Sequence, residues 1–324
     1  MGNPDLKWQQ KRDYNIGLDV KLWDNRITIG GDFYIAKTND LISTLTLPAA
    51  NGFTTYIENI GSLKNTGYEL RLSAYVLRKD QMSWSVSLAG IHNKNKIVEV
   101  SQALLDAQNA IESEDLVNPN VQFRPGYSSN TIWTVRSAGI DPGTGKEVFI
   151  SRDGNRTYNW SASDIVATGV SDPKLEGNIS SMFRYKGLSL NVSFGYRFGG
   201  QIYNSTLANK VEVSKTAIGW NVDARVFHDR WKNIGDQTSF KGLDDFTPTN
   251  KTSRFVQDET TFRCQNMTLQ YELKSQALNK LLGIDYCLFS ASTSDLFYIS
   301  TVKRERGTSY PFSRQFSLGV NVVF

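Results

Sequence analysis

The sequence has only two cysteines and two histidines, and it contains no long run of apolar residues. A single possible cysteine pair does not staple a chain of 324 residues, which excludes a disulfide-rich fold. A membrane helix needs about 20 consecutive, mainly apolar residues, and no segment approaches that. The N-terminal segment also lacks the apolar centre of a signal peptide. The net charge is only +4 and forms no continuous basic stripe, so we do not expect nucleic-acid binding.

The rarity of histidine and cysteine also limits the chemistry of the chain. His92 and His228 fall in different predicted connections, and no CxxC or HExxH pattern occurs, so zinc is not expected. The same two histidines do not supply a Ser-His-Asp triad. Segment 139–155 holds Asp141 and Asp153, but its spacing differs from an EF-hand loop and fits turns. We therefore expect no enzyme activity, catalytic residue, metal or cofactor, with calcium in the loops left open.

Alternation of apolar and polar residues with a period of two is the main pattern present, and it indicates β-strands. Near the N-terminus, Tyr14, Ile16 and Leu18 alternate with Asn15 and Gly17. The pattern recurs in nine segments, at 14–22, 27–35, 68–76, 82–88, 179–185, 188–198, 262–273, about 284–292, and 316–324. Tilted strands of about 9–11 residues span the hydrocarbon core of a bilayer.

The face opposite the apolar side chains carries charges, including Asp32, Arg71 and Arg197. In a β-sandwich these charges face outer water, whereas in a membrane barrel they face a wet lumen. The connections between strands help to choose. Short or medium ones lie at 23–25, 78–80, 186–187 and 274–283, and long ones at 36–65, 92–177, 199–261 and 293–312. Outer-membrane barrels combine short periplasmic turns with long extracellular loops, so we predict an all-β, antiparallel, up-and-down transmembrane β-barrel.

Two smaller elements and one counting problem accompany this prediction. Residues 131–151 indicate an extra hairpin inside the longest connection, and residues 100–111 indicate a short helix there. Barrels of this kind normally close with an even number of strands. An open nine-stranded sheet leaves unsatisfied edges in lipid. Either the count is off by one, or the strands that complete the barrel lie on other chain.

A series of motifs runs through the chain. They are GNPDLKW and YNIGLD near the N-terminus, NIGSLKNTGYEL at 59–70, GIDPGTGKEVFISRDGN at 139–155, DPKLEGNISSMFRYKGLSLNVSFGYRFGGQIYN at 172–204, DRWKNIGD at 229–236, TSRFVQD at 252–258, and YPFSRQFSLGVNVVF at 310–324. In this order they resemble the SusC/RagA family of TonB-dependent outer-membrane transporters of Bacteroidetes. Each motif is loose, but the ordered set covers nearly the whole chain. Cys264 and Cys287 depart from the family pattern, which has apolar or small residues there.

The resemblance implies a barrel of about 22 strands with a plugged lumen. Residues 1–324 are then the C-terminal part of that barrel, without the signal peptide, the TonB box and the plug domain. The implied function is nutrient uptake, with import of oligosaccharides or peptides across the outer membrane. The implied partners are a SusD-like lipoprotein and the TonB–ExbB–ExbD system, reached through the N-terminal region.

The C-terminal strand is the first candidate functional feature. Its alternating apolar residues are Phe316, Leu318, Val320, Val322 and Phe324. In the barrels that the chain resembles, such a last strand with a final Phe is the assembly signal for the barrel-insertion machinery. The same residues also suit an ordinary strand facing outer-membrane lipid, and both roles are compatible.

Aromatic residues in the presumed outer loops are candidate substrate contacts, because flat rings stack on sugar faces and peptide side chains. They are Trp133, Tyr158, Trp160, Trp220 and Trp231. Alternatively, these rings pack the loops together or join the aromatic belt at the membrane interface.

Cys264 and Cys287 are expected to face the lumen from adjacent strands. A hairpin centred near 278–279 separates them by about six residues along the strands, or roughly 20 Å. A disulfide requires Cα atoms within about 7 Å. We therefore predict two free thiols.

Two other interpretations of the chain stay open at this point. The first is a secreted, soluble β-sandwich whose long loops bind glycans. The second is an inactive, truncated remnant of a transporter. Outer-membrane fractionation separates the sandwich from the barrel.

Overall fold

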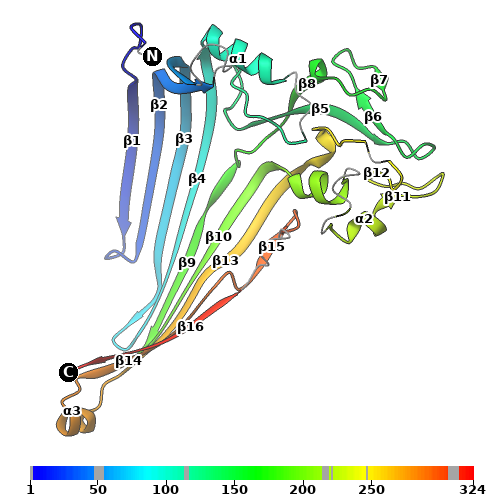
Figure 1. Ribbon diagram of the computed structural model, residues 1–324. Helices are drawn as coiled ribbons and strands as arrows, with labels where there is room; N and C mark the ends of the chain where they lie inside the picture. Colours follow the sequence, from blue (N-terminus) through cyan, green and yellow to red (C-terminus); the bar gives the residue numbers. More distant parts are fainter. Residues whose placement is uncertain are drawn as a thin grey trace.

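The computed structural model describes residues 3–46, 55–112, 117–213, 219, 222–245, 247–305 and 314–324. Its main feature is one large antiparallel sheet (Figure 1). In spatial order its strands are β1 (Gln10–Leu22), β2 (Ile27–Thr46), β3 (Thr55–Lys79), β4 (Met82–Val100), β9 (Leu175–Tyr185), β10 (Leu188–Tyr203), β13 (Val256–Leu273), β14 (Tyr286–Ser294) and β16 (Gln315–Val323). These are the nine predicted segments, in chain order. The short β15 (Tyr298–Ser300) pairs with β13 beside this path.

The strands form a single sheet and not two packed sheets, so the β-sandwich interpretation is wrong. Within the described residues, β1 and β16 each pair on one side only, and the sheet is not closed. No helix in the described part of the chain is long and apolar enough to cross a membrane.

Several strands are longer than the sequence pattern indicates. β2, β3 and β4 contain 20, 25 and 19 residues, and most of the predicted connection 36–65 is strand. At about 3.3 Å per residue, β3 extends for roughly 80 Å, well beyond a hydrocarbon core of about 30 Å. The backbone pairing therefore continues where the apolar alternation, which needs lipid on one side, has ended.

The register separates the sheet into an apolar face and a charged face, because directly paired residues share a face. Ile16 pairs with Phe33 on the apolar face, and Ile16 is 79% exposed. Asp32 pairs with Glu69 on the charged face. There the Arg71 guanidinium forms an ion pair with Asp32 and lies 4.0 Å from the Glu69 carboxylate. The predicted alternation is confirmed.

The short turns all lie at one end of the sheet. Between β1 and β2, Trp23, Asp24 and Asn25 adopt left-handed backbone conformations with φ of 51°, 51° and 62°. Lys186 and Gly187 connect β9 to β10, and Lys186 also has a positive φ of 51°. The last turn at this end holds the helix α3 (Gln276–Leu282), between β13 and β14.

The opposite end carries the elements inserted between β4 and β9 and between β10 and β13, here named the loop module. Its elements are α1 (Gln102–Glu112), β5 (Thr131–Ile140), β6 (Glu147–Ile150), β7 (Arg156–Thr157), η2 (Ala162–Asp164), β8 (Ile165–Val170), η3 (Leu207–Val211), α2 (Arg225–His228), β11 (Arg230–Trp231), β12 (Phe240–Gly242) and η4 (Ser253–Phe255). β7, β6, β5 and β8 form a small four-stranded sheet. The predicted hairpin and short helix are both confirmed.

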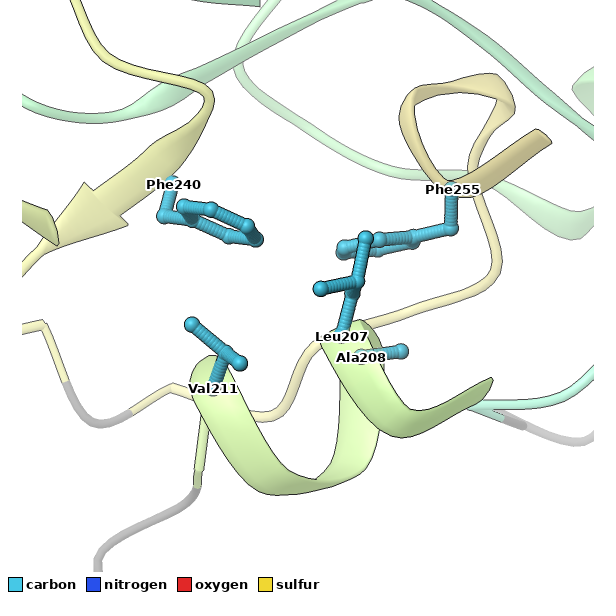
Figure 2. Close-up of a cluster of buried hydrophobic side chains, with 5 residues drawn as sticks. All are labelled: Leu207, Ala208, Val211, Phe240 and Phe255. Carbon is cyan, nitrogen blue, oxygen red and sulfur yellow. The ribbon is translucent and has the colours of Figure 1, made fainter. Parts of the chain in front are cut away.

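Two clusters of buried apolar side chains hold the loop module together. Figure 2 shows the first, in which η3, β12 and η4 bring together Leu207, Ala208, Val211, Phe240 and Phe255. The second consists of Trp133, Val135, Phe149 and Ile165, from β5, β6 and β8. The module therefore packs like a soluble domain, while the large sheet exposes its apolar face.

Two placements differ from expectation. His92 lies within β4, where its Nδ1 is 2.7 Å from the Lys174 carbonyl oxygen, and not in a connection. The cysteines share a face as expected, but it is the apolar face. Cys264 pairs with Phe194, and Cys287 pairs with both Leu273 and Val322.

A bulge explains the error for Cys264. The register skips Gln265 between the pairs Ser193–Asn266 and Phe194–Cys264, which reverses the alternation along β13. For Cys287, the adjacent apolar residues Leu288 and Phe289 left its parity undefined in the sequence. Both thiols are free, as predicted.

Candidate functional site

The loop module is organised around the buried side chain of Arg254, just before the end of η4. Its Nε and Nη2 donate hydrogen bonds of 2.7 and 2.6 Å to the two carboxylate oxygens of Glu147 in β6. Its Nη1 and Nη2 also donate to Glu212, at 2.6 and 3.0 Å. The side chains of Arg254, Glu147 and Glu212 are 7%, 4% and 0% exposed. One guanidinium thus joins segments from both long insertions.

The environment favours the charged forms of Arg254 and Glu212. Burial by itself raises the pKa of Glu212, but Arg254 outweighs it and holds that pKa below its ordinary value. The Lys241 backbone N–H and the Thr249 hydroxyl donate to Glu212 at 2.7 and 3.2 Å. For the Lys241 ammonium, burial is the stronger effect and lowers the pKa. The cluster is a satisfied structural centre, since its donors and acceptors are directed at one another.

A cavity of about 610 Å³ lies beside this cluster. Its lining includes two of the predicted aromatic residues, and consists of Lys146, Glu147, Phe149, Tyr158, Asn159, Trp160, Lys241, Asp245, Thr247, Pro248 and Asn250. Tyr158 is 54% exposed. Amide, carboxylate, ammonium and aromatic groups therefore surround one space, a combination that suits a polar ligand with flat apolar faces.

The exposed position of Tyr158 is fixed by one carboxylate. Its hydroxyl donates a hydrogen bond of 2.7 Å to Asp141 Oδ2, and the Gly143 backbone N–H donates to the other oxygen at 2.9 Å. The hydrogen bond from Tyr158, followed by those from Gly143 and Thr144, lowers the pKa of Asp141. The same bond raises the pKa of the Tyr158 hydroxyl. The carboxylate oxygens of Asp141 thus accept hydrogen bonds from within the same loop segment.

The other predicted aromatic residues lie elsewhere. Trp133 is 4% exposed and packs in the second apolar cluster, with its ring 4.9 Å from that of Tyr127. Trp231 donates from Nε1 to the Pro142 carbonyl at 3.0 Å, and its ring lies where a side chain on Gly145 would be. Trp220 lies outside the described residues. Among the predicted residues that the structure describes, Tyr158 and Trp160 line this same cavity.

The charged face of the large sheet lines further cavities. One of about 610 Å³ on β9, β10 and β13 includes Glu176, Arg197 and Glu259. There Arg197 lies 3.2 Å from Glu259 and 3.9 Å from Glu176. Another, of about 600 Å³, lies on β1 to β4 and includes Asp32 and Arg71. This face is polar, with charges of both signs, as the lumen wall of a barrel requires.

The C-terminal strand presents its alternating residues on the apolar face of the sheet. Phe316, Leu318 and Val320 of β16 pair with Thr293, Ala291 and Phe289 of β14. Leu318 is 87% exposed and Phe324 78% exposed.

In the described part of the chain, no three His, Cys, Asp or Glu side chains lie close enough to hold a metal ion.

The large sheet fits a known family. Residues 1–204 match the family described as TonB dependent receptor-like, beta-barrel, which is more than half of the chain. The chain belongs to this TonB-dependent receptor β-barrel family. Its apolar face is therefore the lipid face of an outer-membrane protein, and its charged face is the lumen wall.

Curated relatives of the chain agree with the SusC/RagA resemblance. It is 26% identical to TonB-dependent receptor SusC of Bacteroides thetaiotaomicron, over 99% of this chain and 32% of the relative. It is 23% identical to TonB-dependent receptor P39 of Formosa agariphila, over 100% of this chain and 36% of the relative. The chain thus spans about a third of the length of these relatives.

Solved structures show the same fold. This chain matches a chain of the RagAB peptide transporter with a TM-score of 0.78 and 24% identity. The match covers 99% of this chain and 36% of the transporter chain. This chain also matches the RagAB peptide importer in the "closed-closed" state with a TM-score of 0.79 and 24% identity, over the same shares of the two chains.

Sequence reasoning missed the Arg254 cluster. Glu147 and Arg254 are 107 positions apart, and charged residues in loops ordinarily indicate solvent exposure. The only available signal was that both lie inside motifs of the family resemblance, GIDPGTGKEVFISRDGN and TSRFVQD.

Proposed function

We propose that this chain is the C-terminal barrel segment of a SusC/RagA-type, TonB-linked importer of oligosaccharides or peptides. The observation that carries the proposal is the division of one antiparallel sheet into a lipid face and a charged wall, with short turns at one end and a packed loop module at the other. The similarity to SusC over 99% of the chain supports the same conclusion.

The proposed partners follow from this function. A SusD-like lipoprotein covers the loop module and delivers ligand, and the TonB–ExbB–ExbD system supplies energy through a region N-terminal to this barrel. The barrel-insertion machinery recognises the strand that ends at Phe324. The exposure of Phe316, Leu318 and Phe324 along the last strand supports that assembly role.

Within the loop module, the cavity beside Tyr158 and Trp160 is the proposed ligand contact. Tyr158 offers an exposed ring, and Asn159, Asp245 and Asn250 offer polar groups around it. The burial of Trp133 favours a packing role for that residue instead. We further infer that the chain carries no bond-breaking step, since its family consists of receptors.

Uptake by cells tests the proposal. Cells that produce the intact protein and its lipoprotein partner should accumulate fluorescent oligosaccharides or peptides from a defined library. Accumulation should stop when TonB is deleted. A protein that fractionates away from the outer membrane, or a deletion strain that accumulates every library member normally, contradicts the proposal. The second result fits an inactive remnant.

A residue-level version of this experiment tests the loop cavity. Tyr158→Ala should raise the ligand concentration for half-maximal uptake by about tenfold, the loss expected when a contact of about 1.4 kcal/mol is removed. The matched control is Phe227→Ala, which removes another aromatic ring that is 55% exposed but does not line this cavity. Equal effects from both variants, at equal amounts in the outer membrane, contradict the assignment.

A further inference from the structure

The helix α3 replaces a short turn at the periplasmic end of the sheet, between β13 and β14 (Figure 1). At 3.6 residues per turn its side chains separate into two sides. The apolar side consists of Ala277, Leu278, Leu281 and Leu282, and the polar side of Gln276, Asn279 and Lys280. A helix of seven residues that only had to reverse the chain would not need this separation.

One hydrogen bond ties the polar side of α3 to the residue just before β14. Asn279 Nδ2 donates to Asp285 Oδ1 at 2.9 Å, and the Asp285 backbone N–H donates to the Val323 carbonyl at 2.7 Å. Asn279 and Leu281 lie about 160° apart around the helix axis. Leu281 therefore lies on the side of the helix turned away from Asp285, and it is 80% exposed, while Leu282 is 61% exposed.

The end of the helix is equally well defined. Gly283 follows Leu282 in the left-handed conformation, with a φ of 67°, and its N–H donates to the Asn279 carbonyl at 2.9 Å. This glycine cap ends the helix where the chain turns back towards β14. The exposed leucines are thus part of a capped helix with a fixed orientation.

The sheet register places α3 at the edge of the lipid face. One row of paired residues crosses that face through Tyr185, Leu188, Tyr271, Phe289 and Val320. Aromatic residues of this kind lie at membrane–water interfaces. The next row is Leu273, Cys287 and Val322. Because α3 begins three positions after Leu273, the helix starts within about 10 Å of this row.

We propose that α3 is a membrane-interface anchor, lying flat in the inner leaflet of the outer membrane with its leucines among the phospholipid acyl chains. Its apolar side continues the lipid face at Leu273, so the same bilayer covers both. Lys280, on the opposite side, extends to the phosphate headgroups. The anchor fixes the depth of the β13–β14 hairpin, to which the last strand is paired.

Spin labels at two positions of the helix test this proposal. In the intact protein, with Cys264 and Cys287 replaced by alanine, a nitroxide is attached to Leu281→Cys or to Gln276→Cys. Each protein is placed in phospholipid nanodiscs, and collisions of the label with oxygen and with a water-soluble nickel chelate are measured. The label at position 281 should collide mainly with oxygen, and the label at position 276 mainly with nickel.

Two other results overturn the proposal. Equal nickel accessibility at both positions places the helix in periplasmic water. Low accessibility to both reagents at position 281 means that protein covers the leucines instead of lipid. Heat-modifiable migration on gels verifies that each labelled barrel is folded, and Leu282→Cys replaces Leu281→Cys if the latter does not fold. The result is independent of uptake, so it does not depend on the transported ligand.

Discussion

Arg254 and Glu147 form a bidentate ion pair inside the loop module, with hydrogen bonds of 2.7 and 2.6 Å. The pair joins the insertion after β4 to the insertion after β10, and Glu212 extends it to η3. Since all three side chains are almost fully buried, the charges have no water to replace a lost partner. The position of the loops therefore depends on this contact.

Replacement of Arg254 tests that dependence. Arg254→Leu leaves two buried carboxylates without the guanidinium that pairs with both, which should destabilise the loop module locally by about 3–5 kcal/mol. Hydrogen exchange measured by mass spectrometry should show faster exchange in β5, β6 and β12, with β1 to β4 unchanged. The control is Arg156→Leu, an exposed position in β7. Identical protection in both variants contradicts the prediction.

Acid should release the segment that holds α2. Hydrogen bonds from Arg225 lower the pKa of Asp223 from 3.8 to about 2. A carboxyl group whose pKa falls on folding stabilises the fold above its ordinary pKa and loses this contribution as pH drops through the folded value. Pepsin cleavage near Phe227 should therefore accelerate as the pH falls from 4 to 2, the range in which Asp223 takes up its proton. The rate is compared at each pH with that of Asp223→Asn, which lacks the carboxylate. A constant ratio over this range refutes the prediction.

A tyrosine that lies across two glycines should set the register of β4, β9 and β10. The Tyr196 hydroxyl donates to the Ala89 carbonyl at 2.8 Å and lies 2.7 Å from where a Cβ would be on Gly90 or Gly177. Gly90→Val should cost about 1–3 kcal/mol by overpacking. Gels run after graded heating should show unfolding at a lower temperature. Ser87→Val, on the opposite face of the same strand, should migrate like the parent protein.

The free thiols give a direct chemical test. Cys287 lies opposite Leu273, nine positions from Cys264 along β13, or about 30 Å. Protein purified without a reducing agent, denatured and treated with N-ethylmaleimide should therefore carry one modification on each cysteine. In lipid, a charged maleimide should label neither, because Cys264 is 1% exposed and Cys287 faces the acyl chains. Peptide mapping reads both positions, and any linked pair of peptides overturns the prediction.

The sequence by itself determined the strands that contact lipid. An environment that is apolar on one side and wet on the other imposes a period of two, so residues such as Ile16, Phe33 and Leu318 reveal their strands and faces locally. The same pattern, together with the lengths of the connections, distinguished a barrel from a sandwich. Beyond the membrane, both faces of the sheet contact water and the alternation is no longer imposed. The extensions of β2 and β3 into residues 36–65 were therefore not recognised as strand from the sequence.

Only the tertiary structure decided the loop module and the position of the thiols. Glu147, Glu212 and Arg254 look like solvent-exposed loop residues in the sequence, and they become a buried cluster because three distant segments fold over them. Likewise, the extra residue at Gln265 turned Cys264 to the lipid face, since a bulge shifts parity without changing composition. Alternation is a local property of the chain, whereas burial of a charge and the register of a bulge depend on partners far away in sequence.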